Sequence, residues 1–270
     1  MTMTKIHPTA VIHPTAKLDS SVVVGPYAVI GEDVEIGADT VVGPHAIVEF
    51  TTMGKNNKIM GGSFIGVPPQ DLKYAGEKTR LIMGDNNVVR ETATLNRGTT
   101  ATGETRIGSN CLIMAYAHVA HDCRIGNHVI LVNSVALAGH IEIGDYAVLG
   151  GISAVHQFTR IGTMAMISGG SMCGKDILPF CIAQGDRAVL RGLNVVGLRR
   201  SGLPRSTISA IRECYKTLFL RGLTQENALA ELKRVEQPKE VQMMIRFIET
   251  SKRGITRPAA GAQAEEEAVA

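Results

Sequence analysis

The feature that most constrains this sequence is an aliphatic residue that returns at every sixth position through the middle of the chain. The positions are Ile107, Ile113, Val119, Ile125, Leu131, Leu137, Ile143, Leu149, Val155, Ile161 and Ile167. Most are followed four residues later by a small or β-branched residue, such as Cys111 or Cys123. A period of six matches neither the 3.6-residue period of a helix nor the two-residue alternation of an ordinary strand. It is typical of a coil with flat sides, each of which points one large apolar residue inward.

The same period occupies the N-terminal part of the chain. It places apolar residues at Ile6, Ile12, Leu18, Val24, Ile30, Ile36, Val42 and Val48. Gly or Pro directly after several of them, as in Gly25-Pro26 and Gly43-Pro44, supplies a corner between short strands. Aromatic residues make up only 4% of the chain and Trp is absent, which suits a narrow interior better than a layered core. We therefore predict a mainly β domain of stacked coils over residues 1–190.

Interruptions of the period predict two loops that leave the coil, near residues 67–80 and 98–105. From Pro204 the apolar pattern changes to a helical period of 3.6 residues. Helices are expected at residues 204–222, 224–235 and 238–252. They would form a C-terminal α-helical domain over residues 191–253. Residues 254–270 contain an Ala run and three consecutive Glu, which predicts a disordered tail.

The five cysteines are odd in number and form no C-x-x-C pair, which favours reduced, buried thiols and a cytoplasmic location. The first ten residues hold no apolar segment of the kind found in export signals, and no run of 18 apolar residues occurs. We therefore expect neither export nor a membrane span.

The charge is unevenly distributed along the chain. Between Asp186 and Arg257 there are fifteen Lys and Arg but seven Asp and Glu, so this region carries about +8 in a chain whose net charge is +3. A solvated basic helical surface accounts for this pattern, and so does a docking surface for an anionic partner. The anionic partner would be a nucleoside diphosphate or an acidic carrier protein, and no nucleic acid is expected.

Three histidines of the repeat fall on one line. If three six-residue sides make one coil, residues 18 apart stack about 4.8 Å from one another as neighbouring strands. His121, His140 and His156 then lie on successive coils, within two residues of the same position around the coil, and His118 lies on the same side. Single surface histidines are usually just solvated, but this convergence favours a functional cluster.

Imidazole clusters either bind metals or transfer protons. A zinc site needs three ligands about 2.0–2.1 Å from one point, and the patch offers no outward Cys. For acid–base chemistry, His121 is followed by Asp122, and an imidazole can act as a base near neutral pH. Gly139 follows His121 by one full coil and leaves a backbone N–H unobstructed directly above it. A base beside an oxyanion donor is the arrangement that acyl transfer requires.

Several segments resemble the motifs of the bacterial UDP-N-acetylglucosamine O-acyltransferase family of lipid A biosynthesis. The segments are QDLKYAGE at residues 70–77, HVAHDC at 118–123, LAGH at 137–140, AVHQF at 154–158 and IAQG at 182–185. The resemblance extends in matching order from about residue 6 to residue 253. It implies a left-handed parallel β-helix of hexapeptide repeats with a C-terminal α-helical domain, assembled as a homotrimer with active sites between subunits.

The resemblance also implies the reaction. A (R)-3-hydroxyacyl group would pass from acyl carrier protein to the 3-hydroxyl of UDP-N-acetylglucosamine, with no metal or tightly bound cofactor. His121 would be the general base, Asp122 would orient it, and the Gly139 N–H would stabilise the oxyanion. The residues that match substrate-binding positions are Gln70, Asp71, Lys73, His118, His140, His156, Gln157, Asn194 and Arg200. Gly169 matches a position that limits acyl-chain length, and Gly there suggests room for a long chain, unless Met164, Met166 or Met172 blocks it.

Three residues depart from the family pattern. Asn96 replaces His, Val196 replaces a uridine-contacting Glu, and Ser201 replaces Arg. They leave open how uridine is held and whether the acceptor is the 3-hydroxyl or the 3-amino analogue of the sugar. The repeat is also compatible with the N-acyltransferase that acts later in the same pathway, which has an additional N-terminal domain, with a zinc-dependent carbonic anhydrase on the same coil, and with a non-catalytic trimeric scaffold.

Overall fold

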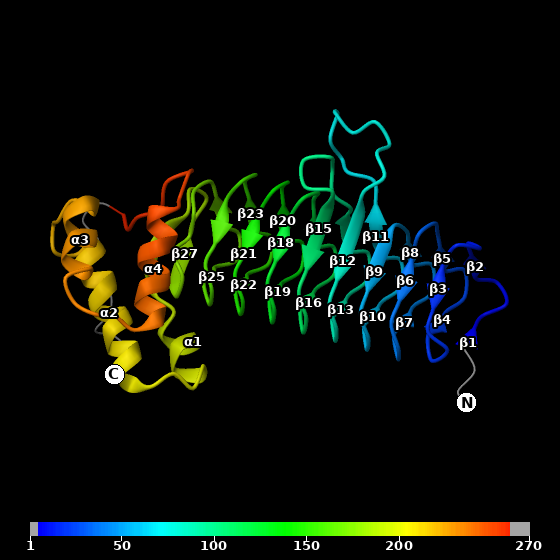
Figure 1. Ribbon diagram of the computed structural model, residues 1–270, viewed down its shortest axis with the longest axis horizontal. Helices are drawn as coiled ribbons and strands as arrows, with labels where there is room; N and C mark the ends of the chain where they lie inside the picture. The colour runs from blue at the N-terminus through cyan, green and yellow to red at the C-terminus, as the bar shows by residue number, and fades with distance from the viewer. Residues whose placement is uncertain (1–4, 260–270) are drawn as a thin grey trace.

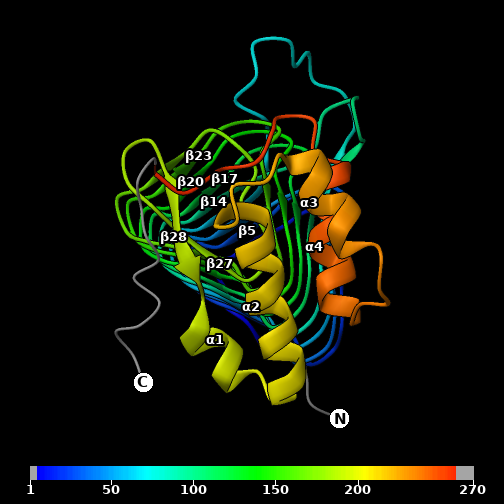
Figure 2. The same cartoon turned by 90° about the vertical axis from the view of Figure 1, so that its left-hand side faces the viewer.

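The computed structural model describes residues 5–259 of the chain. Short parallel strands stack into an elongated β-helix, and the four helices of the described residues lie at its C-terminal end (Figure 1). Viewed along the long axis, the strands outline a three-sided prism (Figure 2). His118 pairs with Ala136 and Ala136 with Ala154, so each coil here consists of three six-residue sides, as the period predicts. The predicted fold class, a left-handed parallel β-helix with C-terminal helices, is confirmed.

Each side of the prism is one sheet. The eleven-stranded sheet contains, in spatial order, β1 (Lys5–Ile6), β4 (Val23–Val24), β7 (Val41–Val42), β10 (Lys58–Ile59), β13 (Val88–Val89), β16 (Leu112–Ile113), β19 (Ile130–Leu131), β22 (Val148–Leu149), β25 (Met166–Ile167), β27 (Cys181–Gln184) and β28 (Val189–Leu193). The nine-stranded sheet contains β2 (Val11–Ile12), β5 (Val29–Ile30), β8 (Ile47–Val48), β11 (Phe64–Val67), β14 (Thr94–Asn96), β17 (His118–Val119), β20 (Ala136–Leu137), β23 (Ala154–Val155) and β26 (Met172–Cys173). The eight-stranded sheet contains β3 (Lys17–Leu18), β6 (Glu35–Ile36), β9 (Thr51–Met53), β12 (Arg80–Met83), β15 (Glu104–Ile107), β18 (Arg124–Ile125), β21 (Glu142–Ile143) and β24 (Arg160–Ile161). All pairings are parallel except that of β27 with β28, which is antiparallel.

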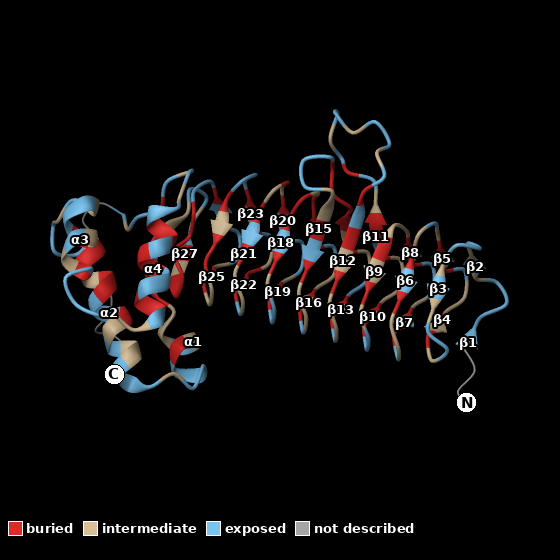
Figure 3. Ribbon diagram, viewed as in Figure 1, coloured by how far each residue is buried: buried red, intermediate tan, exposed pale blue. Residues whose placement is uncertain are grey.

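The repeated aliphatic residue forms the core. In the two-residue strands the second side chain points inward, so Ile113, Leu131 and Leu149 are fully buried. The first points outward, and Ile130 and Val148 are only partly covered. Along the prism, buried residues alternate with intermediate and exposed ones (Figure 3). Because adjacent side chains of a strand point to opposite faces, a two-residue strand delivers one core residue, and the residue two positions before it, such as Val129 or Ala147, is buried as well.

A ladder of buried amides runs inside one corner of the coil. The Asn57 side chain donates to the carbonyls of Gly54 and Gly84 and accepts from the Asn87 N–H at 2.9 Å. Asn87 repeats this one coil further on, donating to the Gly108 carbonyl and accepting from the Cys111 N–H at 2.8 Å. Buried backbone groups at this corner are thereby paired, as low-polarity surroundings demand.

Two loops leave the prism at one edge, between the nine-stranded and eight-stranded sheets (Figure 1). The longer spans residues 68–79, between β11 and β12, and the shorter spans residues 97–103, between β14 and β15. The longer begins at a bulge around Gly66, whose φ is +72° and whose added Cβ would lie 1.9 Å from the Glu49 carbonyl oxygen. Only glycine fits this conformation and this close approach.

The C-terminal region contains α1 (Val195–Arg200), α2 (Arg205–Phe219), α3 (Gln225–Leu232) and α4 (Lys239–Glu249). The last three begin directly after Pro204, Thr224 and Pro238, the residues that start signals predict, and each ends a few residues earlier than expected. The sequence pattern did not predict α1. None of the helices in residues 5–259 is both long and apolar enough to cross a membrane.

The predicted disorder from Gly254 onward is wrong for residues 254–259, and residues 260–270 lie outside the described part. Ile255 bridges to Asp176, and the Leu190 N–H donates to the Arg257 carbonyl at 3.0 Å. Asp176 is fully buried and accepts from the Thr256 N–H through its own carbonyl. The segment is therefore held by pairing with residues far away in sequence. The expected boundary at residue 190 also falls inside a strand, β28.

Candidate active site

The candidate site lies at the same edge as the two loops, in the turns that follow successive strands of the nine-stranded sheet. His121 and Asp122 follow β17, Gly139 and His140 follow β20, and Phe158 follows β23. Asp122, His140 and Phe158 occupy equivalent positions on successive coils and all have φ near +60°, so their side chains project in parallel. His121, His140 and His156 therefore occupy three adjacent positions around successive coils, within the two-residue spread expected from the sequence.

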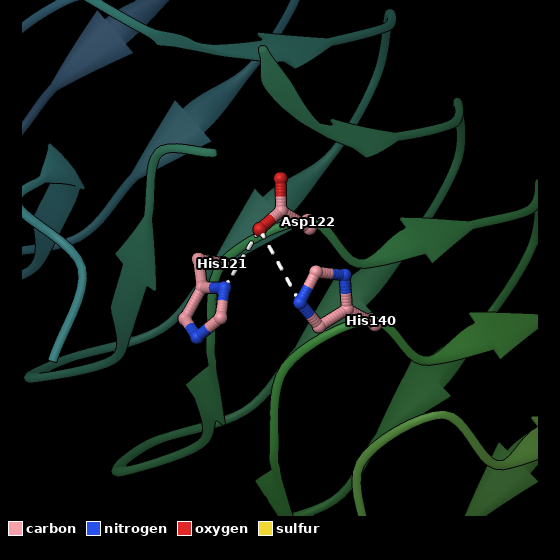
Figure 4. A group of neighbouring side chains, drawn as sticks. All are labelled: His121, Asp122 and His140. Carbon is pink, nitrogen blue, oxygen red and sulfur yellow. Dashed lines mark hydrogen bonds and ion pairs between the residues drawn. The ribbon is translucent and has the colours of Figure 1, made fainter. Parts of the chain in front are cut away.

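His121 is held by Asp122. Its Nδ1 lies 2.7 Å from Asp122 Oδ2 (Figure 4). An ionised carboxylate can only accept a hydrogen bond, so Nδ1 donates and the lone pair is left on Nε2. A base with a fixed tautomer and a free Nε2 is ready to take a proton from a substrate.

Asp122 is buried and surrounded by donors. Oδ1 accepts from the Thr99 N–H at 3.0 Å, Oδ2 accepts from the Thr99 hydroxyl at 2.7 Å, and the Thr102 hydroxyl also donates to Oδ1. Burial alone would raise the pKa of Asp122, but the hydrogen bonds from His121, Thr102 and Thr99 together hold that pKa well below its ordinary value. Asp122 is therefore an anion at neutral pH.

Thr99 and Thr102 were not expected from the sequence. They lie in the short loop one coil below Asp122, next to the place where Thr94 of β14 pairs with His118 of β17. The coil between Thr94 and His118 is six residues longer than the regular 18. If these six residues are subtracted, the 18-residue period places this loop beneath the turn that carries His121.

His140 packs beside the pair. Its ring stacks on Phe158 at 4.6 Å between centroids and meets the His121 ring edge-on at 5.1 Å. His140 Nε2 lies 3.7 Å from Asp122 Oδ2. Burial lowers the pKa of His140 and the nearby His121 adds to this, while Asp122 and Asp71 oppose it. His140 is therefore predominantly neutral at pH 7.

Gly139 leaves open the space above the His121 ring. An added Cβ would lie 2.6 Å from His121 Cε1 and 2.8 Å from Nε2, closer than any side chain tolerates. Within residues 5–259, no acceptor pairs with the Gly139 N–H. Both observations fit a donor that faces the reacting atoms beside the base.

Of the other expected residues on this side of the prism, His118 is half-buried, whereas His156 and Gln157 are exposed. His118 lies on the outer face of the nine-stranded sheet, where Nδ1 is 2.7 Å from Thr94 Oγ1. Burial lowers the pKa of His118, and the neighbouring His121 lowers it further. His156 and Gln157 are exposed in the next turn, with His156 Nδ1 3.2 Å from the Gln157 carbonyl oxygen.

The loop over residues 68–79 carries Gln70, Asp71 and Lys73. The charge of Asp71 acts on the pKa of His140, which places this loop on the side of the histidine cluster. Asn96, one of the departures from the family pattern, is buried beneath the loop and donates to the Pro68 carbonyl at 2.9 Å. Its Oδ1 is buried and has no partner.

Three expected site residues are not brought to this cluster within one chain. Asn194 and Arg200 lie at α1, near the opposite edge of the molecule from the loops (Figures 1 and 2). Asn194 caps α1 by accepting from the Gly197 N–H at 3.0 Å and also donates to the Met164 carbonyl. Gly169 follows β25, at the corner between the eleven-stranded and nine-stranded sheets.

The other two departures lie at α1. Val196 is exposed, and the Ser201 hydroxyl donates to the Leu198 carbonyl at 2.7 Å at the end of the helix. Neither contacts the histidine cluster.

In the described part of the chain, His121, Asp122 and His140 form the one group of three His, Cys, Asp or Glu whose potential ligand atoms lie within 4.8 Å of one another. The Asp122 oxygens already accept hydrogen bonds from His121, Thr99 and Thr102. A carboxylate whose lone pairs already accept these hydrogen bonds is better suited to orienting His121 than to binding a metal.

Family models match both parts of the chain. Residues 176–256 match the model described as UDP N-acetylglucosamine O-acyltransferase, domain 2. Residues 15–50 and 104–139 match the bacterial transferase hexapeptide model of six repeats.

Whole-chain relatives agree with these models. The acyl-[acyl-carrier-protein]–UDP-N-acetylglucosamine O-acyltransferase of Myxococcus xanthus is 49% identical over 258 residues, covering 94% of this chain and 100% of the relative. The enzyme of the same name from Thermodesulfovibrio yellowstonii is 47% identical, with the same coverage of both chains.

Among solved structures, the UDP-N-acetylglucosamine acyltransferase of Francisella novicida superposes with a TM-score of 0.93 at 38% identity, covering 98% of both chains. That of Moraxella catarrhalis superposes with a TM-score of 0.91 at 44% identity, covering 93% of this chain and 99% of the other. With the repeat, the helical region and the loops all aligned over nearly the full length, the chain belongs to the UDP-N-acetylglucosamine O-acyltransferase family.

Proposed function

We propose that this chain transfers a (R)-3-hydroxyacyl group from acyl carrier protein to the 3-hydroxyl of UDP-N-acetylglucosamine, the first step of lipid A biosynthesis. Relatives aligned over 94% of the chain carry the name of this activity. The observation that carries the proposal is the position of His121, which is hydrogen-bonded to a buried carboxylate and lies directly beneath Gly139, whose N–H has no acceptor within residues 5–259. This pairing of base and oxyanion donor is what acyl transfer needs.

The reaction follows from this geometry. His121 Nε2 takes the proton of the sugar 3-hydroxyl as the oxygen attacks the thioester carbonyl carbon. The carbonyl oxygen becomes an oxyanion that accepts a hydrogen bond from the Gly139 N–H. When the tetrahedral intermediate collapses, the carbon–sulfur bond breaks and the imidazolium returns the proton to the thiolate of the carrier. Asp122 stabilises the imidazolium without accepting the proton, because its hydrogen bonds keep its pKa low.

The neighbouring polar groups would bind the substrates. Neutral His140 and His118 each offer one donor and one acceptor, which suits hydroxyl and amide groups of a sugar. The proposed binding residues are Gln70, Asp71, Lys73, His118, His140, His156, Gln157, Asn194 and Arg200, with Gly169 limiting the acyl chain.

A homotrimer would complete this site. Asn194, Arg200 and Gly169 lie at other edges of the chain than His121, so a neighbouring copy would supply them. The eleven-stranded sheet presents an apolar outer face suited to such contact. Its outward residues include Val23, Val41, Val88, Leu112, Ile130, Val148 and Met166.

The proposed donor and location rest on other features. The excess of basic residues between Asp186 and Arg257 is complementary to an acidic carrier protein. All five cysteines are buried thiols that form no disulfide within residues 5–259, which fits the reducing cytoplasm.

Replacing His121 tests the proposal. His121→Ala removes the base, and the activity should fall by the 10²- to 10⁴-fold typical of general-base catalysis, while the oligomer stays folded. The measurement is acyl transfer to UDP-N-acetylglucosamine from carrier proteins loaded with hydroxyacyl chains of several lengths. His128→Ala is the matched control, since His128 is exposed and, within residues 5–259, its ring stacks on Tyr146 alone. Retention of more than about 10% of the activity by His121→Ala would contradict the role of His121.

A second acceptor is favoured by one observation. Asn96 lies where the family carries His and leaves a buried oxygen without a partner beneath the substrate loop. The same assay with the 3-amino analogue of the sugar nucleotide distinguishes O- from N-acylation. Stoichiometric zinc in the purified protein would instead favour a metal enzyme and overturn the acyltransferase proposal.

A further inference from the structure

Arg97 is a buried cation with partners on both sides of the loop over residues 68–79. Its side chain is 9% exposed. Nη1 donates to Glu49 Oε1 at 3.0 Å and to the Gly66 carbonyl at 2.9 Å. Nε and Nη2 donate to the Tyr74 hydroxyl oxygen at 3.1 and 2.8 Å. One guanidinium group thus joins the coil, at Glu49 and Gly66, to the loop, at Tyr74.

The guanidinium also lies close to two aromatic rings. Arg97 Cζ lies 4.3 Å from the centroid of the Phe50 ring and 5.5 Å from that of Tyr74. A planar cation that lies over one aromatic ring and whose edge is filled by hydrogen bonds has one preferred orientation. Lysine cannot reproduce this arrangement, because its ammonium group lacks the planar fork.

Tyr74 in turn organises the loop. Its hydroxyl donates to the Glu77 carbonyl at 2.9 Å, and its N–H donates to the Asp71 carbonyl at 3.0 Å. The Asp71 side chain accepts from the Lys73 N–H at 3.0 Å, which closes the turn. Gln70, Asp71 and Lys73 are therefore displayed on a turn whose anchor is Tyr74.

No other side chain of residues 69–77 makes a hydrogen bond or ion pair with the described part of the coil. The remaining attachments are at the two ends of the loop. Asn96 bonds the Pro68 carbonyl, Thr79 bonds the Gly98 carbonyl, and Lys78 pairs with Asp33 on the surface. The position of the middle of the loop thus depends on the contact between Arg97 and Tyr74.

We infer that Arg97 and Tyr74 are positioning residues for the sugar nucleotide. They form a clamp that presents the loop carrying Gln70, Asp71 and Lys73 to the histidine cluster. This inference rests on the proposed function, since it assigns these three residues to substrate binding. Neither clamp residue touches the reacting atoms.

The clamp also connects the two halves of the site. Thr99, whose N–H and hydroxyl bind Asp122, stands two residues after Arg97 in the same short loop. The segment beginning at Arg97 therefore fixes the substrate loop at one end and the partner of His121 at the other. Loss of the Tyr74 hydroxyl should disturb only the substrate loop, because Thr99 keeps its own hydrogen bonds to Asp122.

Tyr74→Phe is the decisive variant, because it deletes only the oxygen that Arg97 holds. We expect the KM for UDP-N-acetylglucosamine to rise about tenfold or more, the range of one lost hydrogen bond to a charged group, while kcat stays within about threefold. Arg97→Lys should behave alike. Tyr116→Phe is the matched control, since Tyr116 is exposed and its hydroxyl makes no hydrogen bond within the described residues.

Limited proteolysis of the substrate-free protein supplies a readout that needs no activity. Trypsin should cut after Lys73 faster in Tyr74→Phe than in the wild type and in Tyr116→Phe, at unchanged melting temperature. Equal cutting rates would overturn the clamp whether or not the protein is active. Faster cutting with an unchanged KM would overturn its role in substrate binding. A wild type that transfers no acyl group would reject the proposed function, and the cutting rates would still decide whether the clamp exists.

Discussion

At the level of single residues, the proposed site depends on the absence of a side chain at Gly139. The φ of Gly139 is not in the left-handed region, so its backbone conformation does not require glycine. The constraint is space, because any Cβ would collide with the His121 ring. The Gly139 N–H has no acceptor within residues 5–259, so we propose that it stays available to the reacting atoms beside the base.

Gly139→Ala should therefore displace the His121 ring and block the donor. We expect kcat to fall by about 10²-fold or more, the loss found for one oxyanion donor. The melting temperature should change little, because the turn conformation suits alanine. Steady-state kinetics and thermal unfolding measure both quantities.

Gly174→Ala is the control, since an added Cβ there meets nothing within 4 Å and its φ is likewise outside the left-handed region. Wild-type kcat in Gly139→Ala would show that the base and the oxyanion donor have been wrongly placed.

Where the six-residue period is unbroken, the sequence predicts correctly which residues stack on one another. Gly139 stacks above His121 because one full coil separates the two, with no insertion between them. The roles of Thr99 and Arg97 cannot be predicted in this way, because the loops lengthen the coils that contain them. A fixed period does not indicate which residues a side chain contacts across an insertion. The roles of His121, Asp122 and Gly139 stay predictions until the kinetic tests are made.

At the level of elements, the coils are held by pairing between neighbours more than by any single long strand. Strands of two residues have few ladder bonds each, so the buried Asn57 and Asn87 amides carry much of the polar pairing at their corner. A buried backbone group left without its partner costs about 1–3 kcal/mol.

Asn87→Ala should thus lower the free energy of unfolding by about 1–3 kcal/mol for each group it orphans, which includes the Cys111 N–H and the Gly108 carbonyl. Chemical denaturation followed by circular dichroism measures this change. Asn133→Ala serves as the comparison, because Asn133 is exposed and its side chain makes no hydrogen bond within residues 5–259. Equal stability of the two variants would refute the ladder's contribution.

The sequence located the long elements better than the short ones. Helices α2, α3 and α4 have clear start signals and a 3.6-residue period, so they were found to within a few residues. Helix α1 has six residues and includes Gly197, too short and too weak a pattern to be recognised. The 254–259 segment is ordered by Asp176, which lies far earlier in the chain, and no local pattern reports such pairing.

At the level of the whole molecule, the faces of the prism differ in character. The eleven-stranded sheet has an apolar outer row that includes Leu112, Ile130 and Val148. The eight-stranded sheet has a charged row at matching positions, such as Arg124 and Glu142. An apolar row on one side of a long prism indicates an interface, while the charged row suits water.

Ile130→Lys should separate the proposed trimer into single chains, because it places a charge in the middle of the apolar row. Light scattering after size exclusion should show the mass fall to about one third, with the β-sheet circular dichroism retained. Acyl transfer should be lost together with the assembly if residues such as Arg200 come from a neighbour. Arg124→Glu, at the equivalent outward position of the charged row, should leave the mass unchanged. A trimer that survives Ile130→Lys would place the interface on another face.

The three-sided stacking of the coils also governs how this chain can change length. Removing one six-residue unit between His121 and His140 would rotate every later residue by one side of the prism and carry His140 and His156 to a different edge. Removing or adding a whole coil would keep the edges in phase but would change which residue stacks above His121. In this chain the length varies at the corner between the nine-stranded and eight-stranded sheets, where residues 68–79 and 97–103 leave and rejoin the prism and where the coil that pairs Glu35 with Thr52 is shorter than 18 residues. The ends of the prism and this corner are thus where the family can gain or lose residues while His121 keeps Gly139 above it.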